Sequence, residues 1–201
     1  LKLHGEKMLK SESAKYLGHM VSTAVNNNEL IEKRTNSGTG NVAQIMSLLN
    51  SISLGHHYFK IAKILRESIL INGMLFGGSA WYNITENNMR ALEKIDESLL
   101  RQILGAHSKT PLEALYLELG CKPLRFYLMS KRVNYLHYLL NLKETELLHK
   151  VFTAQLKNPV KGDWVLQIME DLKTFQLPTD FNKIKEISKT KFKNMVKNNA
   201  N

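Results

Sequence analysis

Carboxylates are the side chains of this chain that could most readily support catalysis, because groups of them can hold the metal ions used in phosphoryl transfer. Such catalysis needs carboxylates that converge around two ions about 4 Å apart. The aspartates fall in separate predicted elements: Asp96, Asp163, Asp171 and Asp180. The apolar spacing around Asp96 predicts that it lies on the polar side of an amphipathic helix, and Asp163 is predicted to cap another helix. The pattern therefore predicts no phosphoryl-transfer centre.

Nucleophilic and metal-ligating side chains are also scattered. Cys121 is the only cysteine, so no intramolecular disulfide can form and a reducing compartment is expected. The histidines form no cluster with zinc-ligand spacing, and the pair His56-His57 is predicted to lie in a loop or at a helix start. The sequence has no Gly-rich phosphate loop, nucleophile elbow or His-Glu-x-x-His pattern. We expect that this chain alone is not an enzyme and holds no cofactor.

Basic charge is the compositional feature that points to a partner. The 201 residues carry a net charge of +10, from 28 Lys and Arg against 18 Asp and Glu. Residues 181–201 contain six lysines and one glutamate, so much of the excess lies near one end. This distribution favours a polyanionic partner, and a solvated lysine-rich tail is the other interpretation.

Membrane and secretion signals are missing from the sequence. No apolar run approaches the roughly 20 residues that span a bilayer, and no basic-then-apolar leader opens the chain. We therefore expect no membrane partner and an intracellular protein, nuclear or cytoplasmic, that is not secreted. The first residues, from Leu1, already have the pattern of a strand, which favours a fragment of a longer polypeptide.

The elements that must position these residues are predicted to be mainly helical. Residues 1–22 consist of short runs separated by turn residues, which predicts a short N-terminal β-hairpin element. After Asn28 apolar residues recur at spacings of three and four. The first helical face contains Ile31, Gly38, Val42, Ile45 and Leu49, and the small residues Gly38 and Gly40 would let another backbone come close. The predicted fold class is mainly α, with the hairpin element leading into a helical bundle.

Local signals mark the following helices. The second is predicted over residues 58–76, with an apolar stripe at Ile61, Leu65, Ile69 and Gly73. Thr85 is predicted to cap the third helix and Gly105 to end it. Trp81 lies beside two glycines at the corner between these helices, so we expect its indole to be buried.

Sequence motifs in the first half resemble those of a known family. The corner reads Gly78-Ser79-Ala80-Trp81, and the third helix ends with Leu100-Arg101-Gln102-Ile103-Leu104-Gly105. Upstream, Lys15-Tyr16-Leu17-Gly18 leads into a predicted strand. These motifs resemble the reverse transcriptases of non-LTR (LINE-type) retrotransposons in their C-terminal part. The resemblance covers Lys15 to Gly105 and continues more loosely to about Phe175.

The resemblance implies a non-catalytic C-terminal fragment of an RNA-directed DNA polymerase. Residues 1–22 would be the end of the palm with the primer-grip region, 23–105 thumb-like helices, 106–175 a post-thumb helical region and 176–201 a basic C-terminal helix or tail. The Tyr/Phe-x-Asp-Asp turn that binds Mg²⁺ in the family is absent from this sequence. The implied partners are an RNA or DNA duplex, bound through its phosphate backbone, and the missing polymerase palm domain.

A thumb holds a duplex through its phosphates, which requires basic residues on helix surfaces rather than a base-reading code. The candidate nucleic-acid-binding residues are Lys15, Tyr16, Leu17, Gly18, Arg34, Arg66, Arg101, Lys189, Lys191 and Lys193. Two alternatives remain open. A helical protein–protein adaptor would explain the bundle without nucleic acid, and a free-standing nucleic-acid-binding module would explain the basic end.

Overall fold

The computed structural model describes residues 27–51 and 53–199, together with the backbone of short strand segments before them. The strands are β1 (Lys2–Leu3), β2 (Glu6–Lys7), β3 (Ser13–Tyr16) and β4 (His19–Ser22). β1 pairs with β2 and β3 with β4, both antiparallel. The residues between these strands and all side chains before residue 27 lie outside the described part, so the hairpin element predicted over residues 1–22 stays a prediction. The described part of the chain is mainly helical, as predicted.

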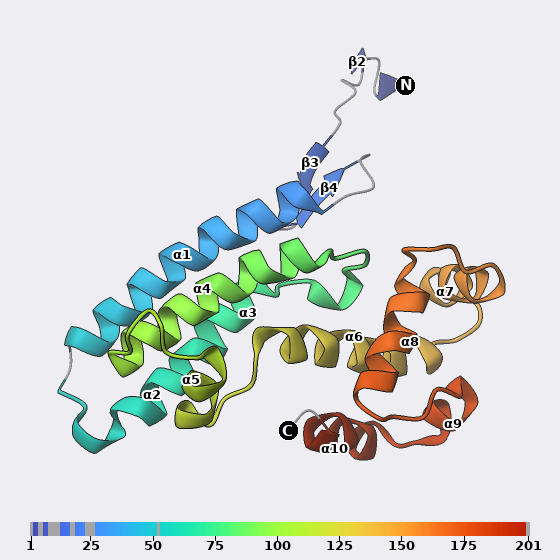
Figure 1. The fold of residues 1–201 in the computed structure, drawn as a ribbon. Helices are drawn as coiled ribbons and strands as arrows, with labels where there is room; N and C mark the ends of the chain where they lie inside the picture. Colours follow the sequence, from blue (N-terminus) through green and yellow to red (C-terminus); the bar gives the residue numbers. More distant parts are fainter. Residues whose placement is uncertain are drawn as a thin grey trace.

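Long helical segments pack side by side to form a first core (Figure 1). They are α1 (Asn28–Ser51), the continuous run of α2 (Tyr58–Leu65), η2 (Arg66–Ile71) and α3 (Asn72–Met74), and α4 (Glu86–Leu104). The 3₁₀ turn η1 (Gly55–His57) starts the second segment, which confirms the helix-start prediction for the histidine pair. Within the continuous run, η2 has π-helical hydrogen bonding, a local widening that is frequent at functional or strained positions.

The predicted face of α1 is the face that packs. Its buried residues include Ile31, Gly38, Val42, Ile45 and Leu49. Gly38 permits close helix contact, because a Cβ there would lie 2.9 Å from Met74 Sδ and 3.0 Å from Ile95 Cγ2. A Cβ at Gly40 would have nothing within 4 Å, so the expectation of a close backbone there is wrong. A two-residue offset turns Gly40 to the other side of the helix.

The stripe predicted for the second helical segment is one residue out of register. Its buried residues recur in steps of four at Ala62, Arg66, Leu70 and Met74. The predicted stripe, from Ile61 to Gly73, is only half-buried along the edge of the core. The prediction fails because a sequence pattern assigns arginine to the surface, whereas here Arg66 occupies the centre of the buried line.

A sharp corner follows this segment. η3 (Gly78–Ala80) is preceded by Gly77, whose φ of 72° favours glycine. Trp81 is 4% exposed, which confirms its predicted burial. The corner also contacts a second tryptophan, because Trp164 Nε1 donates a hydrogen bond to the Ser79 carbonyl at 2.9 Å.

Capping at both ends of α4 follows the sequence signals. The Thr85 side chain accepts a hydrogen bond from the Asn88 N–H, and Gly105 ends the helix in a left-handed conformation with a φ of 59°. Both features confirm the predictions, because such caps depend on residues close in the sequence.

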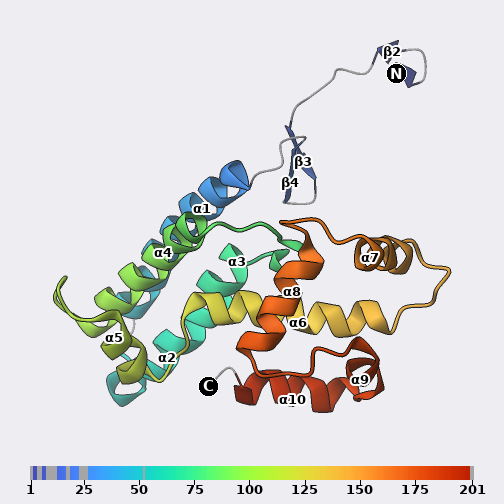
Figure 2. The ribbon, with the colours of Figure 1, turned by 45° about the vertical axis from the view of Figure 1, so that its right-hand side comes forward.

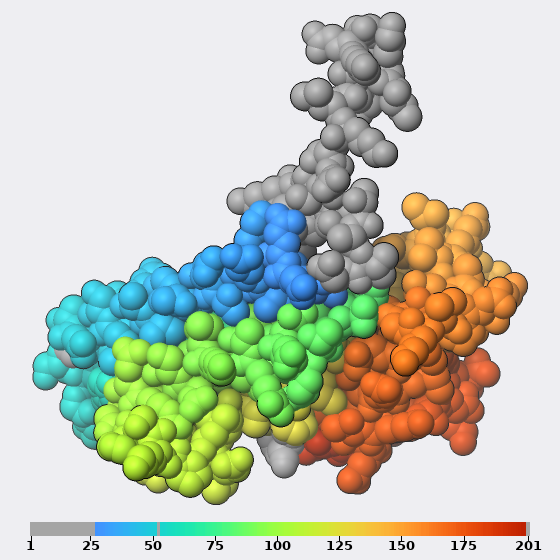
Figure 3. Space-filling view, turned by 45° about the horizontal axis from the view of Figure 1, so that its top comes forward, coloured from blue at the N-terminus to red at the C-terminus, as the bar shows by residue number. Residues whose placement is uncertain are grey.

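α5 (Leu112–Leu119) packs against α4, where its buried residues Leu115 and Tyr116 cluster with Leu100. The helices that follow surround a second core (Figure 2). They are α6 (Leu124–Leu140), α7 (Leu147–Lys157), α8 (Trp164–Thr174), α9 (Phe181–Glu186) and α10 (Lys189–Asn199). α6 joins the two cores: Leu124 and Leu128 pack in the first, and Val133 and Leu136 in the second. In the space-filling view the first helices (blue to green) and the last helices (orange to red) occupy opposite ends of the molecule (Figure 3).

Candidate nucleic-acid interface

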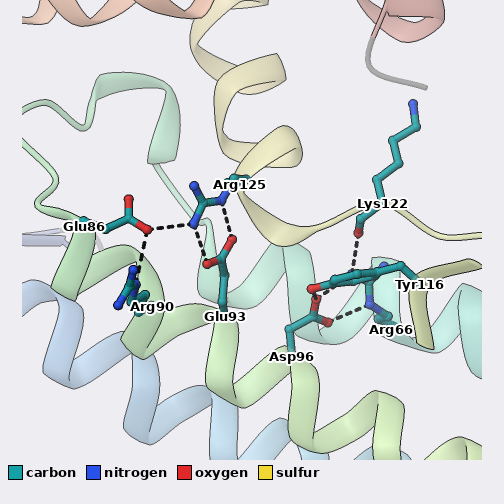
Figure 4. A network of polar contacts seen from close by, with 8 residues as sticks. All are labelled: Arg66, Glu86, Arg90, Glu93, Asp96, Tyr116, Lys122 and Arg125. Carbon is teal, nitrogen blue, oxygen red and sulfur yellow. Dashed lines mark hydrogen bonds and ion pairs between the residues drawn. The ribbon is translucent and has the colours of Figure 1, made fainter. Parts of the chain in front are cut away.

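Arg66 is held inside the first core by a carboxylate. Its Nε and Nη2 donate to the two oxygens of Asp96, each at 2.6 Å, and Nη2 also donates to the Lys122 carbonyl at 2.9 Å. The Tyr116 hydroxyl donates to Asp96 Oδ2 at 3.2 Å (Figure 4). Burial lowers the pKa of Arg66, but the hydrogen bond and charge of Asp96 raise this pKa by more, so the guanidinium stays charged.

This network corrects two predictions. Asp96 is fully buried rather than on the polar side of its helix, and Arg66 is fully buried rather than available to a phosphate. Each residue alone would be too costly to bury, whereas a bidentate pair with further hydrogen bonds compensates both charges. The pairing joins η2 to α4 across 30 positions of sequence, so no local pattern indicates it.

Arg101 is also committed to internal contacts. Its Nε and Nη2 donate to Glu97 at 3.0 and 2.6 Å, Nη1 to the His107 carbonyl at 2.6 Å and Nη2 to the Thr110 carbonyl at 2.9 Å. These bonds fold the loop after α4 back onto the helix. The predicted phosphate contact at Arg101 is therefore replaced by a structural one, because its donors already have carbonyl and carboxylate partners.

Two arginines of α6 follow the same principle. Arg125 binds both oxygens of Glu93 and one oxygen of Glu86 (Figure 4). Hydrogen bonding to Glu93 is the largest cause that raises the pKa of Arg125. Arg132 donates to both oxygens of Asp171 at 2.6 and 2.8 Å. Arginine in these helices mainly builds the fold.

The two remaining aspartates accept hydrogen bonds from nearby backbone N–H groups. Asp163 occupies the N-cap position of α8, as predicted, but its carboxylate accepts from the Val160 N–H at 2.8 Å rather than from the first turn. Asp180 caps α9 by accepting from the Asn182 N–H at 2.9 Å. The four aspartates are thus engaged one by one at separate places.

The other N-terminal candidates have different outcomes. Arg34 lies over the ring of Phe76, 5.4 Å from its centroid, and donates to the Phe76 carbonyl at 3.3 Å. Lys15 and Tyr16 belong to β3, where only the backbone is described. Leu17 and Gly18 lie outside the described residues. The suggested primer-grip contact of this motif stays a prediction.

Lysines gather along one side of α6. Three hollows with volumes of about 410, 600 and 410 Å³ share Asn134 and Lys193 in their linings, so they form one continuous surface, which we call the lysine groove. Its lysines are Lys63, Lys122, Lys131, Lys185, Lys189, Lys193 and Lys197. The same linings contain two glutamates, Glu67 and Glu186. The groove is therefore strongly basic.

Helical periodicity makes α6 the floor of this groove. Tyr127, Lys131, Asn134 and Tyr138 line it and recur at spacings of three and four, which places them on one face. The arginines of α6 lie on the opposite face with their carboxylate partners. One helix thus separates a neutralised arginine face from a lysine face.

The basic C-terminal helix contributes a second wall. α10 is anchored by Phe192 and Val196, which are buried in the second core. Lys189, Lys193 and Lys197 recur every four residues and line the groove. Two of the three predicted C-terminal contacts, Lys189 and Lys193, are thus brought into the groove. Lys191 lies about 200° around the helix from Lys189, so it points away.

Two groove lysines donate to uncharged backbone carbonyls. Lys63 Nζ donates to the Gly120 carbonyl, and Lys122 Nζ donates to the Lys197 carbonyl at 3.2 Å. Burial, followed by the charge of Lys197, lowers the pKa of Lys122. Within the described part of the chain, none of the groove lysines forms an ion pair. The groove therefore has uncompensated positive charge that an anion can neutralise.

Several groove residues were missed by the sequence reasoning. Lys122, Asn134 and Tyr138 carry no motif. Lys122 precedes α6 and the other two lie within it, whereas the groove lysines other than Lys122 and Lys131 belong to other helices. The lysines of residues 181–201 did have a signal, as a basic C-terminal helix or tail, and Lys189 and Lys193 were predicted contacts. The groove is a product of tertiary packing between α2, α6 and α10.

Searches of the described residues for membrane spans and metal sites, and comparisons of the chain with known proteins, found no match. No helix in residues 27–51 and 53–199 has the length and apolar character needed to cross a membrane. In the same residues, no group of three or more His, Cys, Asp or Glu is placed to hold a metal ion. No family model matches the chain, and neither a curated protein nor a solved structure shows significant similarity to it.

Proposed function

We propose that this chain binds the phosphate backbone of nucleic acid through the lysine groove, as the non-catalytic C-terminal part of a reverse-transcriptase-like polymerase. The observation that carries this proposal is the convergence of seven lysines, from segments distant in sequence, on one surface without ion-pair partners among the described residues. Uncompensated lysines attract polyanions, and neutralising phosphates releases counterions that favour binding.

The kind of side chain in the groove supports binding that is independent of sequence. Lysine is a flexible point charge that suits phosphates, whereas bidentate arginine is the commonest reader of guanine edges. The arginines of the described helices mostly bind carboxylates or backbone carbonyls instead. A groove with lysines and few arginines therefore favours binding to the phosphate backbone over recognition of the bases.

The resemblance of the Lys15–Gly105 motifs supports a polymerase context for this grip. The predicted hairpin element over residues 1–22 would connect the helices to a palm domain that holds Mg²⁺ and performs the chemistry. The template–primer duplex, including an RNA–DNA hybrid, would then be the natural ligand. Primer extension on an RNA template by the purified chain with Mg²⁺ or Mn²⁺ should give no product above a buffer control, and templated extension would contradict the proposal.

The test is a fluorescence-anisotropy titration of a labelled RNA–DNA hybrid at several salt concentrations. The logarithm of the binding constant should fall linearly with the logarithm of the salt concentration, by about 0.9 for each phosphate neutralised. The double variant Lys189→Gln/Lys193→Gln should flatten this slope, because both residues line the groove.

Lys191→Gln is the matched control, since it removes the same charge from α10 on the side away from the groove. Equal effects of Lys191→Gln and of Lys193→Gln would mean that net charge, and not the groove, determines binding. No binding at low salt would favour the adaptor alternative.

A specific observation supports that alternative. α7 exposes Leu147, Leu148 and Val151 at 76%, 47% and 49%, while Phe152 on its other side is buried. Adjacent exposed aliphatic residues on a helix are a feature of protein-docking surfaces. The adaptor alternative predicts that Leu148→Glu abolishes a protein interaction and leaves nucleic-acid binding unchanged.

A further inference from the structure

The largest hollow of the lysine groove lies between the η3 corner and α6. Its volume of about 600 Å³ is within the range of roughly 300–1,000 Å³ typical of small-molecule sites. Gly78 and Ser79 form one wall, α6 forms the floor and Lys193 of α10 closes the far side. The wall is fixed in place, because Trp164 donates its hydrogen bond to the Ser79 carbonyl. This hollow is therefore a preformed space at a rigid corner.

Two stacked tyrosine rings line the hollow. Tyr135 and Tyr138 have centroids 5.7 Å apart and planes 23° apart. Tyr135 is backed by Trp164 in an edge-to-face contact at 5.9 Å and 85°. Tyr138 is 48% exposed, so the outer ring of the stack meets solvent while the inner ring is held. An aromatic platform of this kind accepts the face of a nucleobase irrespective of its identity.

Polar groups surround this platform. Asn134 Nδ2 donates to the Ser130 carbonyl at 2.7 Å, while Asn134 Oδ1 is buried and accepts no hydrogen bond in the described part of the chain. A buried carbonyl oxygen without a donor is costly, so a rotation of this side chain that brings the oxygen to a ligand N–H would be favourable. Lys131 and Lys193 line the same hollow and supply positive charge.

We propose that this hollow binds one unpaired nucleotide of a nucleic-acid strand, with its base stacked on Tyr138 and its phosphate near Lys131 and Lys193. The inference rests on the proposed function and makes it more specific, since the rest of the lysine groove continues the path of the backbone. A base within a duplex is stacked on both faces and cannot enter without leaving its pair.

The experiment measures binding of a labelled single-stranded oligothymidylate and of a labelled duplex to the full chain by fluorescence anisotropy. Tyr138→Ala should weaken single-strand binding about tenfold, because loss of one base–aromatic stack has an effect of this order. Duplex binding should stay within about twofold, since it depends on the phosphates. Tyr138→Phe keeps the ring and should retain single-strand affinity.

Tyr82→Ala is the matched control, because Tyr82 is exposed to a similar extent, 43%, and does not line the groove. A second readout uses an oligonucleotide that contains 2-aminopurine, whose fluorescence falls when the base stacks. Quenching by the native chain that is lost in Tyr138→Ala and retained in Tyr82→Ala would support the site.

Other outcomes separate this inference from the proposed function. Equal single-strand affinity of Tyr138→Ala and the native chain, with salt-sensitive duplex binding intact, overturns the nucleotide site alone. Loss of both kinds of binding by the native chain overturns both proposals. Thymidine monophosphate that competes as strongly as the oligonucleotide, and does so through Tyr138, would assign the hollow to a free nucleotide and contradict binding of a strand.

Discussion

The first and second cores each enclose an arginine–aspartate pair, but the two pairs differ in their access to water. In the first core Arg66 and Asp96 are both fully buried. In the second core the side chains of Arg132 and Asp171 are 5% and 3% exposed. Both pairs are bidentate with distances of 2.6 to 2.8 Å, so the direct contact is alike.

Additional contacts distinguish the first pair. The Tyr116 hydroxyl donates to Asp96, and the Lys122 carbonyl accepts from Arg66. The guanidinium of Arg66 also lies over the rings of Tyr116 and Tyr127, at 5.9 and 5.5 Å from their centroids. The pair thus connects η2 and α4 to α5 and to the segment that leads into α6.

The second pair lies beside water-accessible space. Arg132 and Asp171 line a hollow of about 190 Å³ that also includes the polar residues Gln167 and Glu170. Burial raises the pKa of Asp171 by more than the hydrogen bond from Arg132 lowers it. The comparison indicates that the first pair is an enclosed junction of several elements, whereas the second fixes one helix contact, between α6 and α8.

Removal of Asp96 should produce the largest effect. Asp96→Ala leaves Arg66 charged and buried without its carboxylate, so we expect a loss of about 5 kcal/mol in the free energy of unfolding. Urea denaturation followed by circular dichroism measures this loss. The double variant Arg66→Met/Asp96→Leu removes both charges and should recover much of the stability. A loss under about 1 kcal/mol for Asp96→Ala would mean that the pair is solvated and the enclosed junction is wrong.

Truncation of Trp81 tests the packing of the same core without a change in charge. The indole is 4% exposed, so Trp81→Ala should destabilise the chain by about 4 kcal/mol, as for other large aromatic truncations. The measurement is the same urea titration. A much smaller loss would indicate that the corner between α3 and α4 rearranges to fill the space.

Local sequence signals were sufficient for much of the first core. The spacing of the α1 face, the Thr85 cap and the Gly105 helix end involve residues within a few positions of one another, so a single segment carries the information. Burial of Trp81 also followed from its neighbours. These predictions required only helical periodicity and capping chemistry.

Contacts between residues far apart in the sequence explain the features that sequence patterns did not predict. Arg66 and Asp96 are each typical of a surface, and only their mutual contact makes burial favourable. The same applies to the lysine groove, where Lys63 and Lys193 meet at one hollow although 130 positions separate them. From residue type alone, Arg66 and Arg101 were predicted to contact phosphates. In the structure they bind carboxylates, and lysines remain at the surface of the groove.

Removal of Asp171 should have a smaller effect than removal of Asp96. Asp171→Ala leaves Arg132 without its carboxylate, but the adjoining hollow lets water approach the guanidinium. We expect a loss of about 3 kcal/mol, at the lower end for a broken buried pair. The comparison with Asp96→Ala under identical conditions is the measurement. A loss equal to or larger than that of Asp96→Ala would refute the difference in solvation between the two cores.

The smallest effect should come from the hydrogen bond that joins the cores. Trp164 belongs to the second core, and its Nε1 donates to the Ser79 carbonyl at the corner of the first. Trp164→Phe keeps an aromatic ring but leaves this carbonyl without the indole donor. Trp81→Phe removes the same atoms from an indole whose Nε1 is buried and has no partner among the described residues.

The difference between these two variants contains the hydrogen bond and the relief of the unpaired Trp81 N–H, since the loss of ring volume is common to both. Trp164→Phe should be less stable than Trp81→Phe by at least about 1 kcal/mol, the net contribution of one such bond. Urea titrations of both variants, followed by circular dichroism, give this difference. If the two losses are equal, the contact at Ser79 contributes nothing and the cores are joined by the apolar packing of α6 alone. If only Trp164→Phe unfolds in two steps, this hydrogen bond is what makes the two cores unfold together.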